Sequence, residues 1–277
     1  LSRRQRQMCI RDRVYFGRGC VKEFLTCLVK EYDTVMMAYG QGSVKKNGIY
    51  DKVLNILMKE GKNVVEFPDI MPNPTYKKVM EGVSLARGNK VQLILGIGGG
   101  SVMDCAKAVS LAAGFDGDAW ENFWERKGII DFELLPVGVI PTTAGTGSET
   151  TLAAVITDAQ TRYKYAINDF PLIPRYAVLD PKVTLSLPPF ITATTGMDAL
   201  THAVEAYIGN STTYGTRKDA LLAVKLIFEN IDTAYEDGSN VEARRNMLHA
   251  SFYAGCAFTK SYVGYVHAIA HLSLIHI

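Results

Sequence analysis

The chain has 277 residues, 48% of them hydrophobic, and a formal net charge of +2. Its length is sufficient for one large domain or two ordinary domains with a real core. Residues 1–13 contain five arginines and one aspartate, so the rest of the chain is nearly neutral. A nearly neutral body gives no electrostatic reason to expect a nucleic-acid partner.

The five cysteines form an odd set without a Cys-x-x-Cys pair. This usage is typical of a reduced, cytoplasmic protein and argues against a disulfide framework or a thiolate zinc site. No apolar run reaches the roughly 18 residues of a membrane-spanning helix. The basic N-terminal stretch also lacks the apolar core of a secretory signal. We therefore expect no membrane association.

Short apolar runs alternate with amphipathic stretches along the first two thirds of the chain. The expected elements are a strand at 34–40, a helix at 49–61, a strand at 63–68 stopped by Pro68, a helix at 76–88, a strand at 91–97, a helix at 101–114, and strands at 134–141 and 153–157. This alternation predicts an α/β domain with a mainly parallel sheet. Beyond residues 187–190, where two prolines break the pattern, only helical periodicity remains, which predicts a second, all-α domain.

A glycine cluster, Gly98, Gly99 and Gly100, follows a predicted strand and leads through Ser101 into a predicted helix. Backbone N–H groups at a helix N-terminus favour phosphate. Ser101 is also a candidate N-cap, with Asp104 three residues later. A tight, well-capped turn without a ligand is the alternative. The segment is not the usual G-x-G-x-x-G followed by a ribose-binding acid, so an ordinary Rossmann domain is not the best interpretation.

A second small-residue segment, PTTAGTGSETT, begins with Thr142 and Thr143 after another predicted strand. Its hydroxyls and backbone donors fall at the carboxyl end of a strand, where open α/β sheets bind ligands. A threonine-rich loop that makes its own local hydrogen bonds is the alternative.

The helix predicted at 194–208 has an apolar stripe, yet it carries Asp198 and His202 one turn apart on one face. His267 and His271 repeat this spacing in VHAIAHL. A lone histidine on an apolar helix is usually a hydrogen-bonded core residue. Two helices that each carry such a pair favour a metal site instead, and aspartate with histidines suits Fe(II) or Zn(II). A bound metal would compensate the cost of burying Asp198 and His202.

Four blocks together resemble the iron-containing (group III) alcohol dehydrogenases, and among them the butanol-dehydrogenase-like enzymes. The blocks are YFGRGCVKEF, GIGGGSVMDCAKAVS, PTTAGTGSE, and TGMDALTHAVEAYI with GYVHAIAH, in the family's order. The resemblance implies an α/β dinucleotide-binding domain at residues 14–187 and an all-α metal-binding domain at 188–272.

The resemblance also implies roles for individual residues. Asp198, His202 and His267 match metal ligands, and His271 matches the histidine beside the nicotinamide, where it would act in catalysis as a proton relay. The residues that match the cofactor-binding motifs are Gly99, Gly100, Ser101, Asp104, Thr142, Thr143 and Lys164.

The turn after the strand at 34–40 bears on the choice of cofactor. It contains Gly40, Gly42 and Ser43, followed by Lys45 and Lys46. A carboxylate at this turn would hydrogen-bond the ribose 2′-hydroxyl and repel a 2′-phosphate. Because none is present, we predict NADP(H) in preference to NAD(H).

The implied activity is hydride transfer between the nicotinamide and a small primary alcohol or aldehyde, with the metal as a Lewis acid. One alternative is a lyase similar to dehydroquinate synthase, which also uses NAD and a metal. Few lysines and arginines lie near the histidine motifs to bind its phosphorylated substrate, so we favour it less. A cofactor-binding fragment without turnover is a second alternative.

Both ends of the chain depart from the family pattern. The family supplies a fourth ligand histidine about one helix after VHAIAH, and here the sequence ends at Ile277. LSRRQRQMCIRDR stands in place of the expected first strand, and it and LSLIHI read like translated sequencing adapters. We therefore expect residues 1–13 and 273–277 to be non-native, and the chain to be an impaired fragment of a homodimeric parent.

Overall fold

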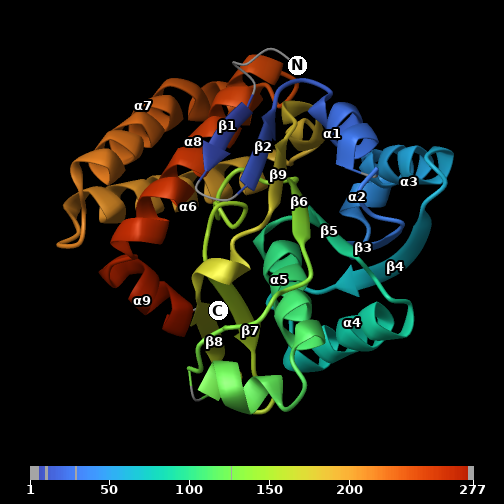
Figure 1. Ribbon diagram of the computed structural model, residues 1–277. Helices are drawn as coiled ribbons and strands as arrows, with labels where there is room; N and C mark the ends of the chain where they lie inside the picture. Colours follow the sequence, from blue (N-terminus) through green and yellow to red (C-terminus); the bar gives the residue numbers. More distant parts are fainter. Residues whose placement is uncertain (1–5, 10–11, 29, 126, 274–277) are drawn as a thin grey trace. The chain divides into compact units, whose positions relative to one another are not determined.

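The computed structural model describes residues 6–9, 12–28, 30–125 and 127–273, with side chains over 14–28, 30–125 and 127–270 (Figure 1). The chain divides into two compact units. Unit 1 comprises the chain up to Pro141 together with Leu152–Asp180, and unit 2 comprises Thr142–Thr151 and the chain from Pro181 onward. The helical part of unit 2 therefore begins at Pro181, earlier than the predicted start at residue 188, and unit 2 also includes the loop of residues 142–151.

Unit 1 contains a seven-stranded sheet in the order β1-β2-β9-β6-β5-β3-β4. The strands are β1 (Arg6–Cys9), β2 (Asp12–Phe16), β3 (Thr34–Gly40), β4 (Asn63–Ile70), β5 (Leu93–Gly98), β6 (Val137–Pro141) and β9 (Tyr176–Leu179). All neighbours pair in parallel except β1, which is antiparallel to β2. The mainly parallel sheet confirms the predicted fold class.

Burial explains why the strands take these places. In β3 the residues Val35–Tyr39 are all buried, and β5 is buried throughout, as expected for inner parallel strands covered on both faces. β4 alternates between buried and exposed positions because it lies at the sheet edge. Proline is tolerated on an edge strand, so Pro68 does not stop β4, contrary to our expectation.

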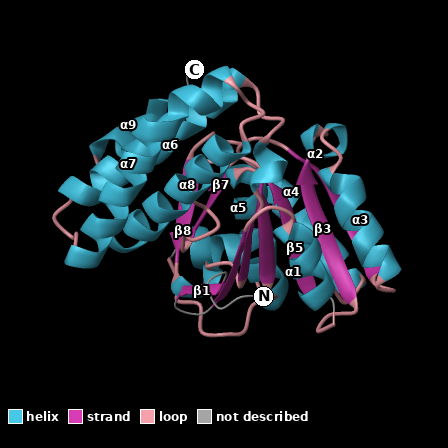
Figure 2. Ribbon diagram, turned by 90° about the horizontal axis from the view of Figure 1, so that it is seen from above, coloured by secondary structure: helices cyan, strands magenta, loops and turns pink. Residues whose placement is uncertain are grey.

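The helices of unit 1 fall into two groups (Figure 2). They are α1 (Cys20–Leu28), α2 (Ser43–Lys46), α3 (Ile49–Lys59), α4 (Tyr76–Gly88) and α5 (Gly100–Gly114). α1 packs against α3, whereas α4 packs against α5. The chain runs outward from β3 to β4 and then back to β5 and β6, so right-handed crossovers place the two groups on opposite faces.

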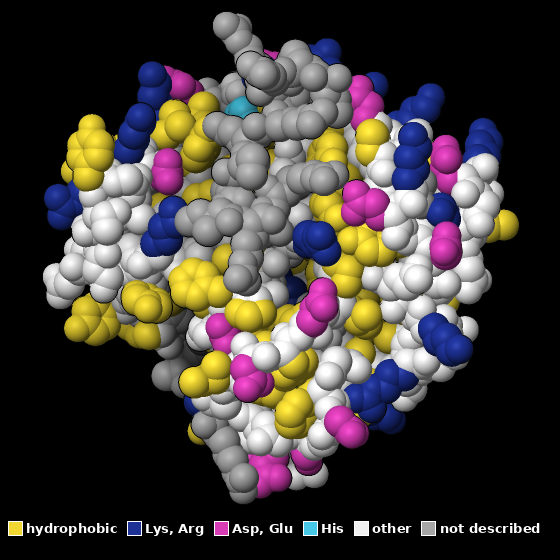
Figure 3. Space-filling view, in the orientation of Figure 1, with side chains coloured by type: hydrophobic (Ala, Val, Ile, Leu, Met, Phe, Trp, Pro, Cys, Tyr) yellow, Lys and Arg dark blue, Asp and Glu magenta, His cyan; other side chains and the backbone are white. Residues whose placement is uncertain are grey.

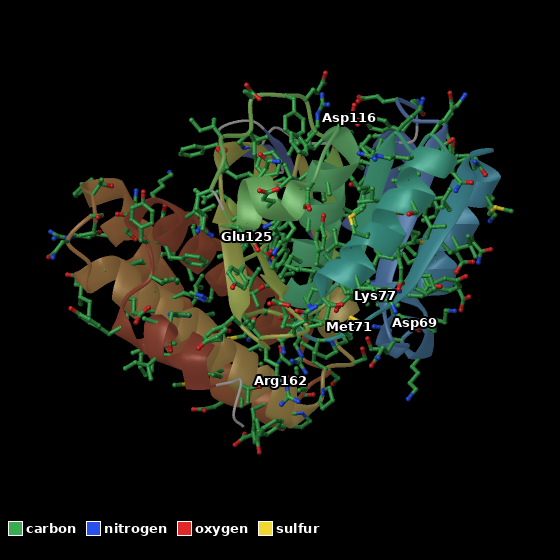
Figure 4. The ribbon with its side chains drawn as sticks, turned by 90° about the horizontal axis from the view of Figure 1, so that it is seen from below. Asp69, Met71, Lys77, Asp116, Glu125 and Arg162 are labelled. Carbon is green, nitrogen blue, oxygen red and sulfur yellow. The ribbon has the colours of Figure 1, made fainter. Side chains whose placement is uncertain are left out.

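A small antiparallel sheet completes unit 1. It pairs β7 (Ala153–Thr157) with β8 (Lys164–Asn168), so the strand predicted at 153–157 exists but lies outside the main sheet. Thr157 forms a bridge with Thr75, at the start of α4. In Figure 4, Asp69, Met71 and Lys77 mark the passage from β4 into α4, and Arg162 marks the turn between β7 and β8. The described residues also form the short helical turns η2 (Trp120–Glu125), η3 (Phe170–Leu172) and η4 (Pro181–Thr184).

The regular secondary structure of unit 2 is helical over its described residues, and loops connect the helices. Its helices are α6 (Pro189–Ile208), α7 (Tyr214–Glu236), α8 (Val241–Ser261) and α9 (Tyr265–Ser273). α6, α7 and α8 pack pairwise. Each of the three contributes one alanine to each of two buried layers, which are Ala203, Ala223 and Ala254, and Ala206, Ala220 and Ala257. Small side chains at these positions let the helix axes approach closely, which fixes the orientation of α6.

Among the described residues, the helices are all too short or too polar to cross a bilayer. On the face drawn in Figure 3, lysine and arginine are interspersed with aspartate and glutamate. The visible surface therefore carries no large patch of a single sign.

Candidate metal centre and cofactor loops

The candidate metal centre begins on one face of α6. Asp198, His202 and Glu205 follow one another at spacings of four and three residues, so they form one stripe along the helix. His202 and Glu205 are buried, and the Asp198 side chain is 38% exposed. The stripe thus presents one partly solvated carboxylate beside a buried imidazole.

His267, in the first turn of α9, completes this cluster. Its Nε2 lies 3.6 Å from Oδ1 of Asp198, and Nδ1 of His202 lies 3.9 Å from Oδ2 of the same carboxylate. One potential ligand atom from each of the three residues lies within 4.8 Å of the others. Two separate helices therefore bring the three predicted ligands together within unit 2.

The two imidazole rings are fixed by stacking. The His202 ring lies between His267, with ring centroids 4.1 Å apart, and Phe258 of α8, with centroids 4.2 Å apart. The planes are tilted by only 20° and 13°. This stack restricts rotation of the His202 ring and leaves its edge directed toward Asp198.

The chemistry of these groups fits a divalent metal. Nδ1 of His202 is buried and has no hydrogen-bond partner among the described residues, which is costly unless something else satisfies it. Burial lowers the pKa of His202 to about 4 although Asp198 acts in the opposite direction. The imidazole is therefore neutral near pH 7, and its lone pair is available to a metal. One carboxylate with two imidazoles suits Fe(II) or Zn(II).

Glu205 belongs to this site, although the sequence analysis did not single it out. Its Oε2 lies 2.6 Å from Nδ1 of His267. Burial opposes protonation of His267, but Asp198 and Glu205 together outweigh that effect and raise its pKa. The signal for Glu205 was present in the sequence, because it continues the stripe of Asp198 and His202 by one further turn.

The glycine turns of unit 1 lie at the ends of adjacent strands. β3 and β5 pair up to Tyr39 and Ile97, so Gly40 and Gly98 follow side by side. The helices after these two strands diverge to opposite faces, which makes this the switch point where open α/β sheets bind ligands. Gly98 is required there, since a Cβ atom would lie 2.6 Å from a methyl group of Val102. The chain thereby turns directly from β5 into α5.

The start of α5 differs from our prediction. The helix begins at Gly100 with Gly99 as its N-cap, so Ser101 is not the cap. The Ser101 hydroxyl instead accepts a hydrogen bond of 3.2 Å from the backbone N–H of Asn73. Asp104 accepts one of 3.2 Å from the N–H of Val155 in β7. Both side chains therefore hold neighbouring backbone segments, at Asn73 and in β7, beside the turn by hydrogen bonds.

Thr142 and Thr143 open the loop of unit 2 that extends to Thr151. This loop lies against two helices of its own unit. A Cβ atom on Gly145 would meet Thr195 of α6 at 2.7 Å, and one on Gly147 would meet Gly255 of α8 at 2.7 Å. Gly147 also has a φ of +59°, a conformation that glycine adopts at little cost. The two glycines permit this close approach.

Two further residues, one predicted to contact the cofactor and one to act in catalysis, lie outside the three-residue cluster and the glycine turns. Lys164 is half-buried in β8, opposite Thr157, and desolvation lowers its pKa. His271 lies on α9 four residues after His267, but its side chain is outside the described residues. Its predicted catalytic role stays a prediction.

Comparison with known proteins places the chain in a class. The model of the family described as "Iron-containing alcohol dehydrogenase" matches residues 12–181. The model described as "Fe-containing alcohol dehydrogenase family, C-terminal" matches residues 192–273. Together they cover both units, and the chain belongs to the iron-containing alcohol dehydrogenase family.

Individual relatives are named as dehydrogenases of small alcohols. The chain is 40% identical to the 1,3-propanediol dehydrogenase of Klebsiella pneumoniae over 228 residues, which are 82% of this chain and 58% of that protein. It is 37% identical to the NAD-dependent methanol dehydrogenase of Bacillus methanolicus over 255 residues, 92% of this chain and 66% of the relative. These relatives give no support to the lyase alternative.

A solved structure of a 1,3-propanediol oxidoreductase superposes with a TM-score of 0.89 at 35% identity, covering 95% of this chain and 68% of the other. The fold of the family is therefore present along nearly all of the chain. The chain spans 58% of the length of the Klebsiella relative.

Proposed function

We propose that this protein is a metal-dependent oxidoreductase that transfers hydride between a nicotinamide cofactor and a small primary alcohol or aldehyde. The observation that carries the proposal is the convergence of Asp198, His202 and His267, with the buried Nδ1 of His202 directed toward the same carboxylate. The names of the relatives support the reaction class.

The three side chains offer a cation one negative charge and two imidazole nitrogens. A divalent cation bound there would act as a Lewis acid on the substrate oxygen, while the nicotinamide would supply or accept the hydride. Asp198 would balance part of the cation's charge from the solvent-facing side, since it is the most exposed of the three. His202 would bind without first losing a proton, because it is already neutral near pH 7.

The proposal can be tested by metal titration of the chain. After treatment with chelator, Zn(II) or, without oxygen, Fe(II) should bind with one equivalent per chain by calorimetry. Asp198→Asn should weaken binding by at least about 100-fold, since it removes a ligand charge in a partly desolvated site. Asp232→Asn on α7, a change of the same chemistry at an exposed position, should leave it unchanged.

Reduction of butanal by the reduced cofactor should appear on metal addition and be lost in Asp198→Asn. Equal metal affinity in the wild type and in Asp198→Asn would refute this metal site. Metal-independent reduction would refute the proposed reaction.

We further propose that the cofactor is NADP(H) rather than NAD(H). The turn after β3 holds Gly40, Gly42 and Ser43 and offers no carboxylate to a ribose 2′-hydroxyl. Lys45 lies beside this turn, with its ammonium 5.2 Å and 4.7 Å from the ring centroids of Tyr39 and Tyr50. The two rings support a fixed positive charge where a 2′-phosphate would need one. The Bacillus relative is described as NAD-dependent, so the two cofactors must be compared directly.

Fluorescence titration should give tighter binding of NADPH than of NADH. Lys45→Met should weaken NADPH binding about tenfold and leave NADH binding nearly unchanged, since only the 2′-phosphate would contact the ammonium. Lys59→Met, at the exposed end of α3, is the matched control. Tighter binding of NADH by the wild type would contradict this proposal.

A further inference from the structure

We propose that Glu205 is the positioning residue of the candidate metal centre. Its carboxylate fixes the tautomer and the ring orientation of His267, and the same carboxylate fastens the start of α9 to α6. This inference rests on the proposed function in one respect, since it treats Nε2 of His267 as a metal ligand.

The contacts of Glu205 all lead to one short segment. Oε2 lies 2.6 Å from Nδ1 of His267 and accepts a hydrogen bond of 2.7 Å from the N–H of Gly264. Oε1 accepts bonds of 2.7 Å from the N–H of Val266 and 3.4 Å from the N–H of His267. A carboxylate that is only 6% exposed is thereby satisfied by donors that all belong to residues 264–267.

These contacts determine the tautomer of neutral His267. An ionised carboxylate only accepts hydrogen bonds, so the ring nitrogen in the shorter contact with a carboxylate carries the proton. That nitrogen is Nδ1, 2.6 Å from Glu205, and not Nε2, 3.6 Å from Asp198. With the proton on Nδ1, the lone pair lies on Nε2, the atom 3.6 Å from Oδ1 of Asp198. A metal needs that lone pair, and a carboxylate behind the imidazole is the usual way to orient it.

The same oxygens hold the first turn of α9. The first N–H groups of a helix have no partner within the helix, and Glu205 accepts those of Val266 and His267. Gly264 makes this contact possible, because a Cβ atom there would lie 3.0 Å from Cδ and Oε1 of Glu205. The position of His267 therefore depends on the Glu205 carboxylate of α6. The same helix carries the other two candidate ligands, Asp198 and His202.

If Glu205 were only a structural cap of α9, its replacement would have a different effect on His267. If Glu205 only held the helix end, its replacement would loosen α9 without changing which ring nitrogen of His267 is protonated. Glu205→Gln separates the two roles. The amide keeps one acceptor oxygen, but its NH₂ group would face Nδ1 as a donor and favour the tautomer with the proton on Nε2.

The first measurement is the tautomer state, by long-range ¹H–¹⁵N NMR on histidine-labelled, metal-free protein at alkaline pH. The His267 signals are assigned by their loss in His267→Asn. The wild type should carry the proton on Nδ1, and Glu205→Gln should carry it on Nε2. This readout needs no metal, so it remains decisive for the wild type even if a variant fails to fold.

The second measurement is Zn(II) affinity by competition with a chromophoric chelator. Glu205→Gln should bind about 10- to 100-fold more weakly than the wild type. Gly264→Ala, which displaces the carboxylate without removing it, should also weaken binding. Glu229→Gln on the exposed face of α7 is the matched control and should bind as the wild type does.

The outcomes separate the two proposals. A wild type with the proton on Nε2, or a folded Glu205→Gln with unchanged tautomer and unchanged Zn(II) affinity, overturns the role of Glu205. A wild type with the expected tautomer that binds no metal overturns the proposed function, and with it the metal-directed part of this role, while leaving the tautomer assignment in place.

Discussion

At the scale of single residues, Phe258 stabilises the site without offering a ligand. Its ring stacks on His202 with centroids 4.2 Å apart, on the side opposite His267. Phe258→Leu keeps an apolar side chain but removes the flat surface that fixes the ring plane. Since aromatic pairs contribute about 0.5–1.5 kcal/mol, we expect Zn(II) affinity to fall by roughly two- to tenfold.

The matched control for this prediction is Phe228→Leu on α7, where the side chain is 69% exposed. Calorimetric titration of both variants with Zn(II) checks the prediction. Equal loss in the two variants would show that the effect is general destabilisation and not a property of the stack.

His249 contributes to the pH dependence of stability, separately from the candidate metal site. Burial and, to a lesser degree, the charge of Arg245 lower its pKa to about 4 from 6.5. Between these two values the unfolded chain binds more protons than the folded chain, so stability decreases as the pH falls from 6.5 to 4. His249→Gln removes this contribution and should make the urea midpoint less dependent on pH in that window.

The measurement is urea unfolding at several pH values with chelator present, followed by circular dichroism. His202, whose pKa is also lowered to about 4, keeps part of the pH dependence in the variant. A variant with the same pH slope as the wild type would contradict the role of His249.

The candidate site could be predicted only in part from single residues. The spacing of Asp198 and His202 on one helix face, and of the histidines in VHAIAHL, pointed to a metal site, and the family resemblance selected the three groups that converge. Glu205 continues the stripe of Asp198 and His202, but its partners are Gly264 and the start of α9, so helix spacing alone did not give it a role. Ser101 was assigned as a cap because its alternative partner, the N–H of Asn73, is distant in the sequence.

At the scale of elements, most segments with a periodic pattern were predicted, whereas some short strands were not. The strand at 34–40 and the helix at 76–88 have the expected bounds. The four-residue strand β9 was missed because it is too short for a periodic signal. β2 was not expected either, yet it pairs in parallel with β9. Such strands are specified by their neighbours in the sheet, which the local sequence does not reveal.

The loop 142–151 provides a prediction at this scale. A Cβ atom on Gly255 of α8 would lie 2.2 Å from Oγ1 of Thr150 and 2.9 Å from the carbonyl oxygen of Gly147. Gly255→Ala therefore requires the loop to move away from α8. We expect a loss of about 1–3 kcal/mol in stability and faster amide exchange across the loop.

Gly215→Ala on α7 is the control, since the nearest atom to its added Cβ lies 3.8 Å away. Hydrogen exchange followed by mass spectrometry compares the two variants. Unchanged exchange of the loop in Gly255→Ala would contradict the close packing described above.

At the scale of the whole molecule, the metal and the cofactor should protect different elements. The candidate metal ligands lie only in unit 2, and the glycine turns after β3 and β5 lie only in unit 1. A ligand stabilises the state that binds it by about 2.7 kcal/mol at 100 times its Kd. Zn(II) should therefore slow amide exchange in α6 and α9, whereas NADPH should slow it at the carboxyl ends of β3 and β5.

Hydrogen exchange with Zn(II), with NADPH and with chelator alone tests this division, and Asp198→Asn sharpens it. That variant should lose the response of α6 and α9 to Zn(II) and keep the response of the glycine turns to NADPH, because only unit 2 has lost a ligand. Protection by Zn(II) spread equally over both units, or retained in Asp198→Asn, would mean that the metal binds elsewhere. The stripe of Asp198 and His202 would then have to be interpreted as a feature of packing alone.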